Sequence, residues 1–192
     1  MMKCRVYNEL MTVLIIHGIG GNAQENWFPW MKTELEQKGI ETIVPDFPDA
    51  NAPMLDAWLD HAAATHRISS ETILVGHSLG AAFALRLLER STTKVCATFL
   101  VSPVWKTPQN KFAPLMITFT EDPYDWEAIR ENAGSLHIVH GGGDPYLSED
   151  YARELGTHLK HDITLIPGGG HLNASAGYTT FPALRDSILT FS

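Results

Sequence analysis

The segment Gly76-His77-Ser78-Leu79-Gly80 constrains the fold more than any other part of this sequence. It follows the apolar run TILV and precedes LGAAFALRLLER, which has the composition of a helix. A serine on such a sharp strand-to-helix turn is lifted above the sheet, and side chains two positions before and after it would collide with neighbouring backbone. The segment therefore predicts a strand–turn–helix unit that exposes the Ser78 hydroxyl. The alternative is an ordinary glycine-rich turn in which Ser78 caps the helix.

The rest of the chain alternates short apolar runs with helix-like stretches. We expect strands at residues 12–17, 41–44, 72–76, 95–101, 136–140 and 163–166. We expect helices at residues 29–38, 54–66, 79–90, 149–159 and 181–191. Such alternation predicts an α/β fold with a mostly parallel sheet of about six strands and helices on both faces. Because no linker or repeat interrupts the pattern, residues 1–192 are expected to form a single domain.

Two segments do not follow the pattern. Residues 104–132 contain prolines and several aromatic side chains without a clear period, and we assign no element there. Residues 1–10 are compatible with an N-terminal tail or with an extra edge strand through Cys4 to Tyr7.

Charge and hydropathy exclude several classes of partner. The net charge is −8 without a basic run, so phosphate backbones would repel the chain and nucleic acid is not expected as a partner. The apolar runs are too short to span a bilayer, and no apolar stretch follows the first basic residues, so a cytoplasmic location is expected. No cluster has metal-ligand spacing, so neither a metal nor a cofactor is expected. The sequence does not indicate an oligomeric state.

A serine hydroxyl needs a base within hydrogen-bond reach to act as a nucleophile. His171 follows a glycine run directly after the last expected strand, and Asp144 follows another glycine run after the strand before it. The order serine, aspartate, histidine along the chain is that of α/β-hydrolases. Asp122 and Asp125 are rival acids, but they lie in the unassigned stretch. The sequence therefore predicts Ser78 as nucleophile, His171 as base and Asp144 as the group that orients the base.

The remaining site residues follow from where the strands end. The Leu79 N–H, and a second N–H from the loop after the first strand, best from Ile19, would form the oxyanion hole. Trp27 and Trp105 follow strand ends that face the nucleophile, and we expect them to wall a shallow, partly open apolar pocket. Such a pocket would accept small esters with short acyl or aryl groups.

The segments HGIGGNAQENWFPW, VPDFP, GHSLGA, GGGDPYLS and GGGHLN together resemble small serine hydrolases of the retinoblastoma-binding-protein-nine and YdeN type. The resemblance runs from Thr12 to the end of the chain. It implies a minimal α/β-hydrolase fold without a large cap domain, with the family's serine, aspartate and histidine at Ser78, Asp144 and His171. It supports a serine hydrolase, for which we expect a carboxylesterase that works through an acyl-enzyme, but it does not indicate the substrate.

Two other functions are compatible with parts of the sequence. Gly18-x-Gly20-x-x-Ala23 after a strand fits a dinucleotide-binding turn, with Asp46 as a possible ribose ligand. However, Pro29 falls where the helix of that motif should already be under way. The fold could also serve as a non-catalytic protein-binding module, which a fold alone never excludes.

Overall fold

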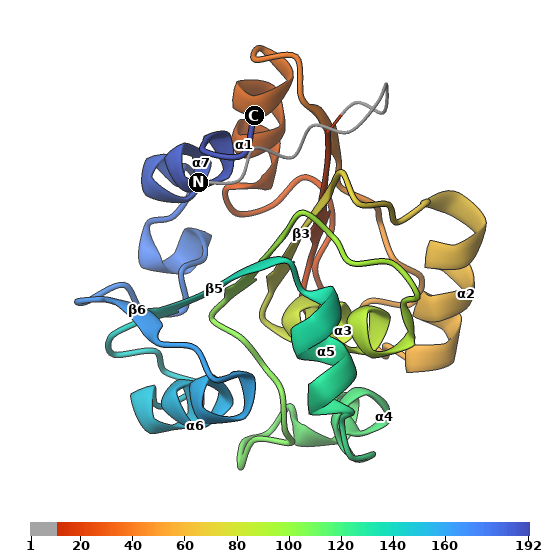
Figure 1. The fold of residues 1–192 in the computed structure, drawn as a ribbon. Helices are drawn as coiled ribbons and strands as arrows, with labels where there is room; N and C mark the ends of the chain where they lie inside the picture. The colour runs from red at the N-terminus through yellow and green to blue at the C-terminus, as the bar shows by residue number, and fades with distance from the viewer. Residues whose placement is uncertain (1–10) are drawn as a thin grey trace.

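The computed structural model describes residues 11–192, which contain one six-stranded sheet in the order β2-β1-β3-β4-β5-β6 (Figure 1). Every neighbouring pair of strands is parallel. The strands are β1 (Thr12–Ile16), β2 (Glu41–Ile43), β3 (Thr72–His77), β4 (Ala97–Val101), β5 (Ser135–Gly141) and β6 (Ile163–Ile166). The expected sheet is confirmed, and each strand lies within two residues of its predicted bounds. The predicted tail or edge strand at residues 1–10 lies outside the described residues.

The helices connect successive strands. They are α1 (Phe28–Glu36), α2 (Leu55–Thr65), α3 (Leu79–Arg90), α4 (Ile117–Thr120), α5 (Trp126–Asn132), α6 (Glu149–Leu159) and α7 (Pro182–Leu189). Five of them correspond to the predicted helices. The other two, α4 and α5, lie in the stretch that the sequence left unassigned.

The alternation of side chains along β1 divides the core into two layers. Val13 and Ile15 belong to a cluster with residues of α1 and α7, whereas Leu14 and Ile16 belong to a cluster with residues of α2, α3, α5 and α6. A strand buried on both sides reads as a continuous apolar run, as residues 13–16 do. The expected placement of helices on both faces is therefore confirmed (Figure 1).

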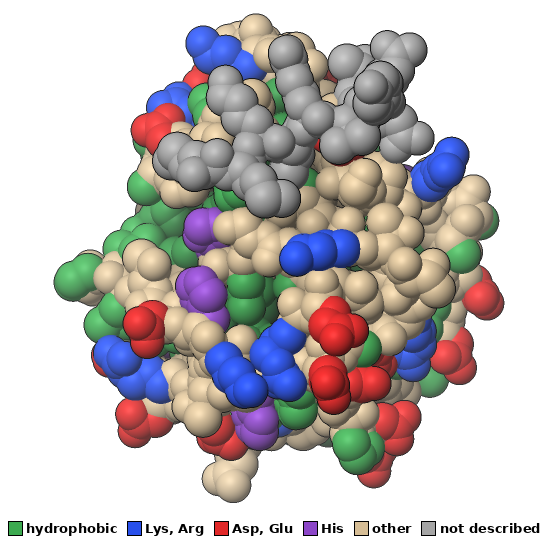
Figure 2. Space-filling model, viewed as in Figure 1, with side chains coloured by type: hydrophobic (Ala, Val, Ile, Leu, Met, Phe, Trp, Pro, Cys, Tyr) green, Lys and Arg blue, Asp and Glu red, His purple; other side chains and the backbone are tan. Residues whose placement is uncertain are grey.

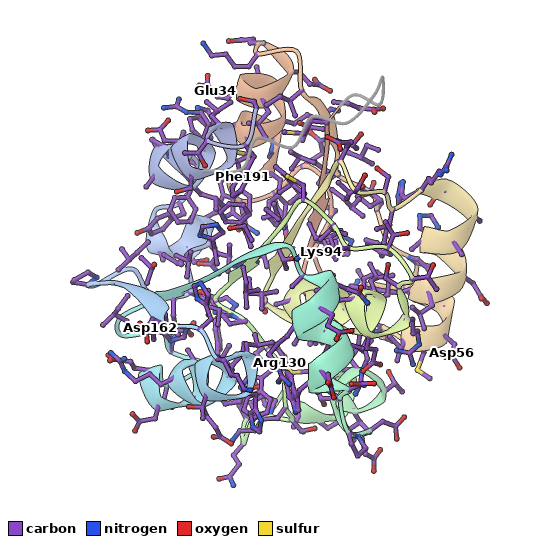
Figure 3. The ribbon with its side chains drawn as sticks, viewed as in Figure 1. Glu34, Asp56, Lys94, Arg130, Asp162 and Phe191 are labelled. Carbon is purple, nitrogen blue, oxygen red and sulfur yellow. The ribbon has the colours of Figure 1, made fainter. Side chains whose placement is uncertain are left out.

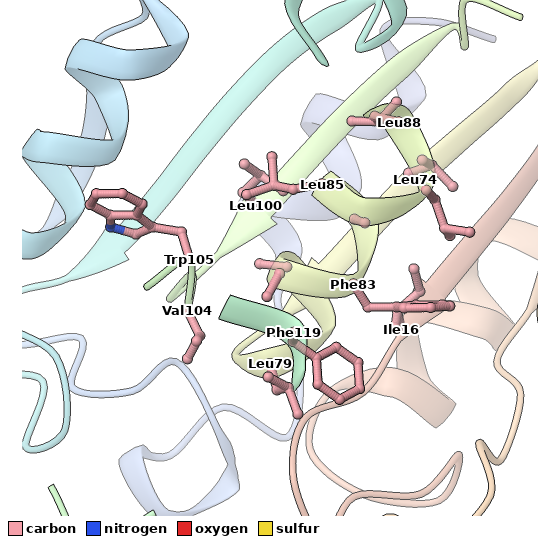
Figure 4. Packing of buried hydrophobic residues seen from close by; sticks show 14 of the residues in the cluster. Ile16, Leu74, Leu79, Phe83, Leu85, Leu88, Leu100, Val104, Trp105 and Phe119 are labelled. Carbon is pink, nitrogen blue, oxygen red and sulfur yellow. The ribbon is translucent and has the colours of Figure 1, made fainter. Parts of the chain in front are cut away.

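Helix α3 is the most deeply buried helix of the described residues, with residues 79–88 all buried. Figure 4 shows Phe83, Leu85 and Leu88 of this helix packed among Leu74 of β3 and Leu100 of β4. Each fully buried leucine or phenylalanine contributes roughly 1.5–3 kcal/mol to stability. Because α3 starts at the strand-to-helix turn, this packing fixes the position of that turn.

On the other face, α1 and α7 lie side by side (Figure 1). Arg185 of α7 forms an ion pair of 2.6 Å with Glu34 of α1. Glu34 is labelled in Figure 3. Partly exposed pairs of this kind contribute at most about 1 kcal/mol. The apolar layer beneath, which includes Phe28 and Ile188, therefore does most to hold the two helices against the sheet.

The segment between β4 and β5 forms no separate cap domain. It contains a 3₁₀ turn at Ala113–Leu115 and the short helices α4 and α5. Arg86 of α3, only 1% exposed, anchors this segment. Its Nε donates a hydrogen bond of 2.8 Å to the Phe119 carbonyl, and its guanidinium lies 3.8 Å from the centroid of the Tyr124 ring. The part of the segment around α4 is therefore packed against α3.

No helix among residues 11–192 is long and apolar enough to cross a membrane. In the same part of the chain, no three His, Cys, Asp or Glu side chains are arranged to hold a metal ion. Acidic and basic side chains are interspersed over the face of the molecule in Figure 2.

Candidate active site

Ser78 occupies the turn between β3 and α3 in a backbone conformation that non-glycine residues rarely adopt, with φ 57° and ψ −121°. Such a conformation costs on the order of 1–3 kcal/mol and is found mainly at functional sites. A Cβ added at Gly76 would lie 2.5 Å from the Gly80 carbonyl oxygen, and one added at Gly80 would lie 2.2 Å from that of Ile16. The Ser78 side chain makes no capping hydrogen bond to α3, so the alternative of a helix-capping serine is not supported.

Asp144 and His171 are joined by a hydrogen bond of 2.7 Å from His171 Nδ1 to Asp144 Oδ2. The other carboxylate oxygen of Asp144 accepts hydrogen bonds from the backbone N–H groups of Tyr146 at 2.8 Å and Leu147 at 3.2 Å. The carboxylate is fully buried, whereas 9% of the imidazole is exposed. A carboxylate can only accept, so Nδ1 carries the proton and Nε2 of His171 is free to take one.

Ser78 and His171 line the same cleft, which has a volume of about 340 Å³. Among the described residues, the Ser78 hydroxyl and the His171 imidazole are not joined by a hydrogen bond. Catalytic hydrogen bonds are often long in a free enzyme and shorten only when substrate binds. The structure therefore brings the three predicted residues to one site, with the base oriented by the acid.

Two backbone N–H groups near Ser78 are available to stabilise an oxyanion. Leu79 is the first residue of α3, where the N–H has no acceptor within the helix, and Ile19 lines the cleft. Neither N–H donates a hydrogen bond to another of the described residues. A Cβ added at Gly18 would lie 2.9 Å from Ser78 Cβ, so the loop that carries Ile19 lies directly against the nucleophile.

His77 has a role that the sequence did not reveal. Its Nε2 donates a hydrogen bond of 3.0 Å to the carbonyl of His171. Burial, together with the nearby His171 imidazole, lowers the pKa of His77 to about 3, so the ring is neutral at physiological pH. Only its place beside Ser78 on the strand could have indicated a contact with the site, because the partner lies far away in the sequence.

Trp27 does not line the cleft, and its predicted place on the pocket wall is wrong. The side chain is 0% exposed and packs against Phe28, His77 and Phe181 on the α1 face of the sheet. Its Nε1 donates a hydrogen bond of 3.0 Å to the carbonyl of Leu172. Trp27 and His77 therefore hold two consecutive carbonyls in the loop that carries His171.

Trp105 is also absent from the cleft, although it follows β4 as expected. Figure 4 shows the side chain directed toward α6, where its Nε1 donates to the Tyr151 carbonyl at 2.9 Å. Only 6% of the residue is exposed. The apolar wall of the cleft is formed instead by Ile19, Val104, Phe112, Met116, Tyr146 and Leu147.

Replacing Trp27 by alanine is expected to lower the free energy of unfolding by about 3–5 kcal/mol, because it empties a large buried site and leaves the Leu172 carbonyl without its donor. Urea unfolding followed by circular dichroism measures this loss. Trp30→Ala is the control and is expected to cost less, since Trp30 is partly exposed. If Trp27→Ala raises KM for short esters and leaves stability unchanged, Trp27 belongs to the pocket wall after all.

The dinucleotide-binding alternative is not supported by the loop after β1. Asp46 Oδ1 accepts a hydrogen bond of 2.7 Å from the Ala23 N–H, so this carboxylate is already bound to the loop. Helix α1 starts only at Phe28, well beyond the glycines. The backbone N–H groups of a helix N-terminus, which would bind the pyrophosphate, are therefore not next to that turn.

Comparison with known proteins places these observations in a family. A family described as serine hydrolase matches residues 13–189 of the chain. The chain belongs to the serine hydrolase family. It is 27% identical to YdeN of Bacillus subtilis, over 93% of this chain and 95% of YdeN. It is 29% identical to the serine hydrolase RBBP9 of Rattus norvegicus, over 82% of this chain and 85% of that protein.

Solved structures agree on the fold of this serine hydrolase. The crystal structure of the ydeN gene product from B. subtilis superposes with a TM-score of 0.88, covering 94% of this chain and 98% of that chain. Est1E from Butyrivibrio proteoclasticus superposes with a TM-score of 0.69 at 16% identity, covering 95% of this chain and 88% of Est1E. At that identity the likeness concerns the fold alone. The expected α/β-hydrolase fold and the resemblance to the YdeN type are confirmed.

Proposed function

We propose that this serine hydrolase is a carboxylesterase that cleaves small esters with short acyl or aryl groups through an acyl-enzyme. The observation that carries the proposal is the hydrogen bond of 2.7 Å between His171 and the buried Asp144, in a cleft that Ser78 also lines. An oriented base beside a serine on a strained turn is the arrangement that nucleophilic catalysis requires.

In the proposed reaction, Ser78 Oγ attacks the ester carbonyl while His171 Nε2 takes the hydroxyl proton. The N–H groups of Ile19 and Leu79 stabilise the negative charge that develops on the carbonyl oxygen. The carbon–oxygen bond to the alcohol then breaks, and the imidazolium returns the proton to the leaving oxygen. Water repeats the sequence on the acyl-enzyme and releases the acid. No metal or cofactor is needed for these steps.

The shape of the cleft supports short substrates. Its volume of about 340 Å³ lies near the lower end of small-molecule pockets. The connection between β4 and β5 supplies Val104, Phe112 and Met116 as a wall, and Arg86 fixes that connection in place. A long acyl chain would extend beyond this wall into solvent.

A series of p-nitrophenyl esters from acetate to palmitate tests the proposal. We expect kcat/KM to be highest for the short or aryl acyl groups and to fall for the long ones. A fluorophosphonate probe should label the wild-type protein and not a Ser78→Ala variant. A preference for the palmitate ester over the butyrate ester would show that Val104, Phe112 and Met116 do not limit the length of the acyl group. Absence of both labelling and turnover would favour the non-catalytic binding module.

A further inference from the structure

We propose that Glu25 selects substrates whose leaving group carries a positive charge, so that the preferred esters are those of amino alcohols or quaternary ammonium alcohols. This inference rests on the proposed ester hydrolysis and specifies its substrate class. The reaction is unchanged: the acyl–oxygen bond breaks, and the amino alcohol leaves with the proton that His171 held.

Glu25 is an unbalanced negative charge in the cleft. It lines the cleft together with Ser78 and His171, and none of the described residues that line it is a lysine or an arginine. The ion pairs within residues 11–192 do not include Glu25. The other carboxylate near the base, Asp144, already accepts hydrogen bonds from the imidazole and from two backbone N–H groups.

The surroundings of the Glu25 carboxylate satisfy it only weakly. Its Oε1 accepts one side-chain hydrogen bond, from Asn26 Nδ2 at 3.4 Å. The residue is half-buried, and burial raises the pKa of Glu25, an effect that a backbone hydrogen bond from Asn22 partly offsets. A half-buried carboxylate without a cation is costly, and a cationic ligand would remove that cost.

We infer the place of the Glu25 carboxylate relative to the leaving group from its link to the loop of the base. Val104 and Met116 of the apolar wall come from the connection between β4 and β5, whereas Asn173 and Ser175 come from the loop that carries His171. Asn26, next to Glu25, accepts a hydrogen bond of 2.9 Å from the Ala174 N–H and so ties Glu25 to the loop of the base. The base delivers its proton to the leaving oxygen, so the groups on its loop surround the alcohol part of the ester.

The electrostatics of the reaction point the same way. A Cβ added at Gly21 would lie 2.8 Å from Glu25 Oε1, so the carboxylate lies against the same loop that carries the Ile19 N–H. A fixed negative charge near a developing oxyanion opposes the reaction unless a cation accompanies it. A substrate with a cationic leaving group supplies that cation, and the net charge of −8 attracts it to the protein.

The test compares three butyrate esters of similar shape by pH-stat. Butyrylcholine carries a cation, 3,3-dimethylbutyl butyrate is its neutral isostere, and 2-sulfoethyl butyrate carries an anion. We expect kcat/KM of the wild-type protein to fall in that order. In Glu25→Gln, the ratio of the cationic to the neutral ester should fall about tenfold, as expected for two unit charges several ångströms apart in a partly solvated cleft.

Two variants control the test. Glu127→Gln removes an exposed carboxylate on α5 and reports the effect of net charge alone, and Glu25→Asp keeps the charge in the cleft. The ratio should be unchanged in Glu127→Gln and largely retained in Glu25→Asp. An unchanged ratio in Glu25→Gln, or an equal fall in Glu127→Gln, would overturn the inference.

The wild-type series alone tests the inference even if the Glu25 variants fail to fold. Equal kcat/KM for the cationic and anionic esters would overturn it. The neutral ester separates this inference from the proposed function. If the neutral ester is cleaved and the cationic and anionic esters are cleaved equally well, only the proposed role of Glu25 is wrong. If no ester is cleaved and Ser78 is not labelled, the proposed function itself is wrong.

Discussion

Replacing Ser78 by alanine is expected to lower kcat for p-nitrophenyl butyrate by about a millionfold, as loss of the nucleophile does in serine hydrolases. The hydroxyl makes no capping bond to α3, so its loss should change the free energy of unfolding by no more than about 1 kcal/mol. Initial rates and urea unfolding of the same preparation measure the two quantities.

Ser102 provides a matched control for this substitution. It also follows a buried strand, has a positive φ of 42°, and is buried with its Oγ lacking a hydrogen-bond partner. Ser102→Ala should therefore retain activity within about twofold. If Ser78→Ala keeps activity within tenfold of wild type, or if Ser102→Ala is the inactive variant, the nucleophile has been assigned wrongly.

The sheet and the turn at Ser78 could be predicted because local sequence determines both. A strand buried on two faces must be apolar throughout, as residues 13–16 are, and only glycine fits the positions that contact the backbone of Ile16 and Gly80. The carboxyl ends of parallel strands lie along one edge, so residues just after β3, β5 and β6 had to come together. That geometry brought Ser78, Asp144 and His171 to one site.

The tryptophans could not be placed from the sequence because tertiary packing decides where they point. Trp27 directly precedes α1, and the rotation of that helix on the sheet directs the ring into the core instead of the cleft. Trp105 is drawn toward α6 by its hydrogen bond to the Tyr151 carbonyl. Neither the packing of Trp27 nor the hydrogen bond of Trp105 produces a periodic hydrophobic pattern in the surrounding sequence.

The stretch from 104 to 132 escaped prediction for a related reason. Helix α4 has four residues and α5 has seven, which is too short for an amphipathic period to be recognised. Arg86, a charged residue in the buried part of α3, donates hydrogen bonds to the carbonyls of Phe119 in α4 and of Asp122 before α5. The same stretch supplies Phe112 and Met116 to the cleft, so the sequence predicted which segment contributes to the apolar wall but not which of its side chains do so.

Replacing Asp144 by asparagine is expected to lower kcat by about ten-thousandfold while the protein stays folded. The asparagine oxygen can still accept from the N–H groups of Tyr146 and Leu147, which keeps the loop in place. The amide nitrogen then faces His171 Nδ1 and donates to it. The imidazole must carry its proton on Nε2, where it cannot accept one from Ser78.

Asp122→Asn is the control for assigning Asp144 as the residue that orients His171, because the sequence analysis considered Asp122 as an alternative for this role. Its side chain is exposed, and only its backbone carbonyl is used, by Arg86. We expect this variant to keep wild-type kcat and KM. Fluorophosphonate labelling adds a direct readout of serine reactivity, which should be slow in Asp144→Asn and normal in Asp122→Asn. If labelling and turnover were lost in Asp122→Asn and retained in Asp144→Asn, the short hydrogen bond between Asp144 and His171 would be structural, and the acid would lie in the connection between β4 and β5.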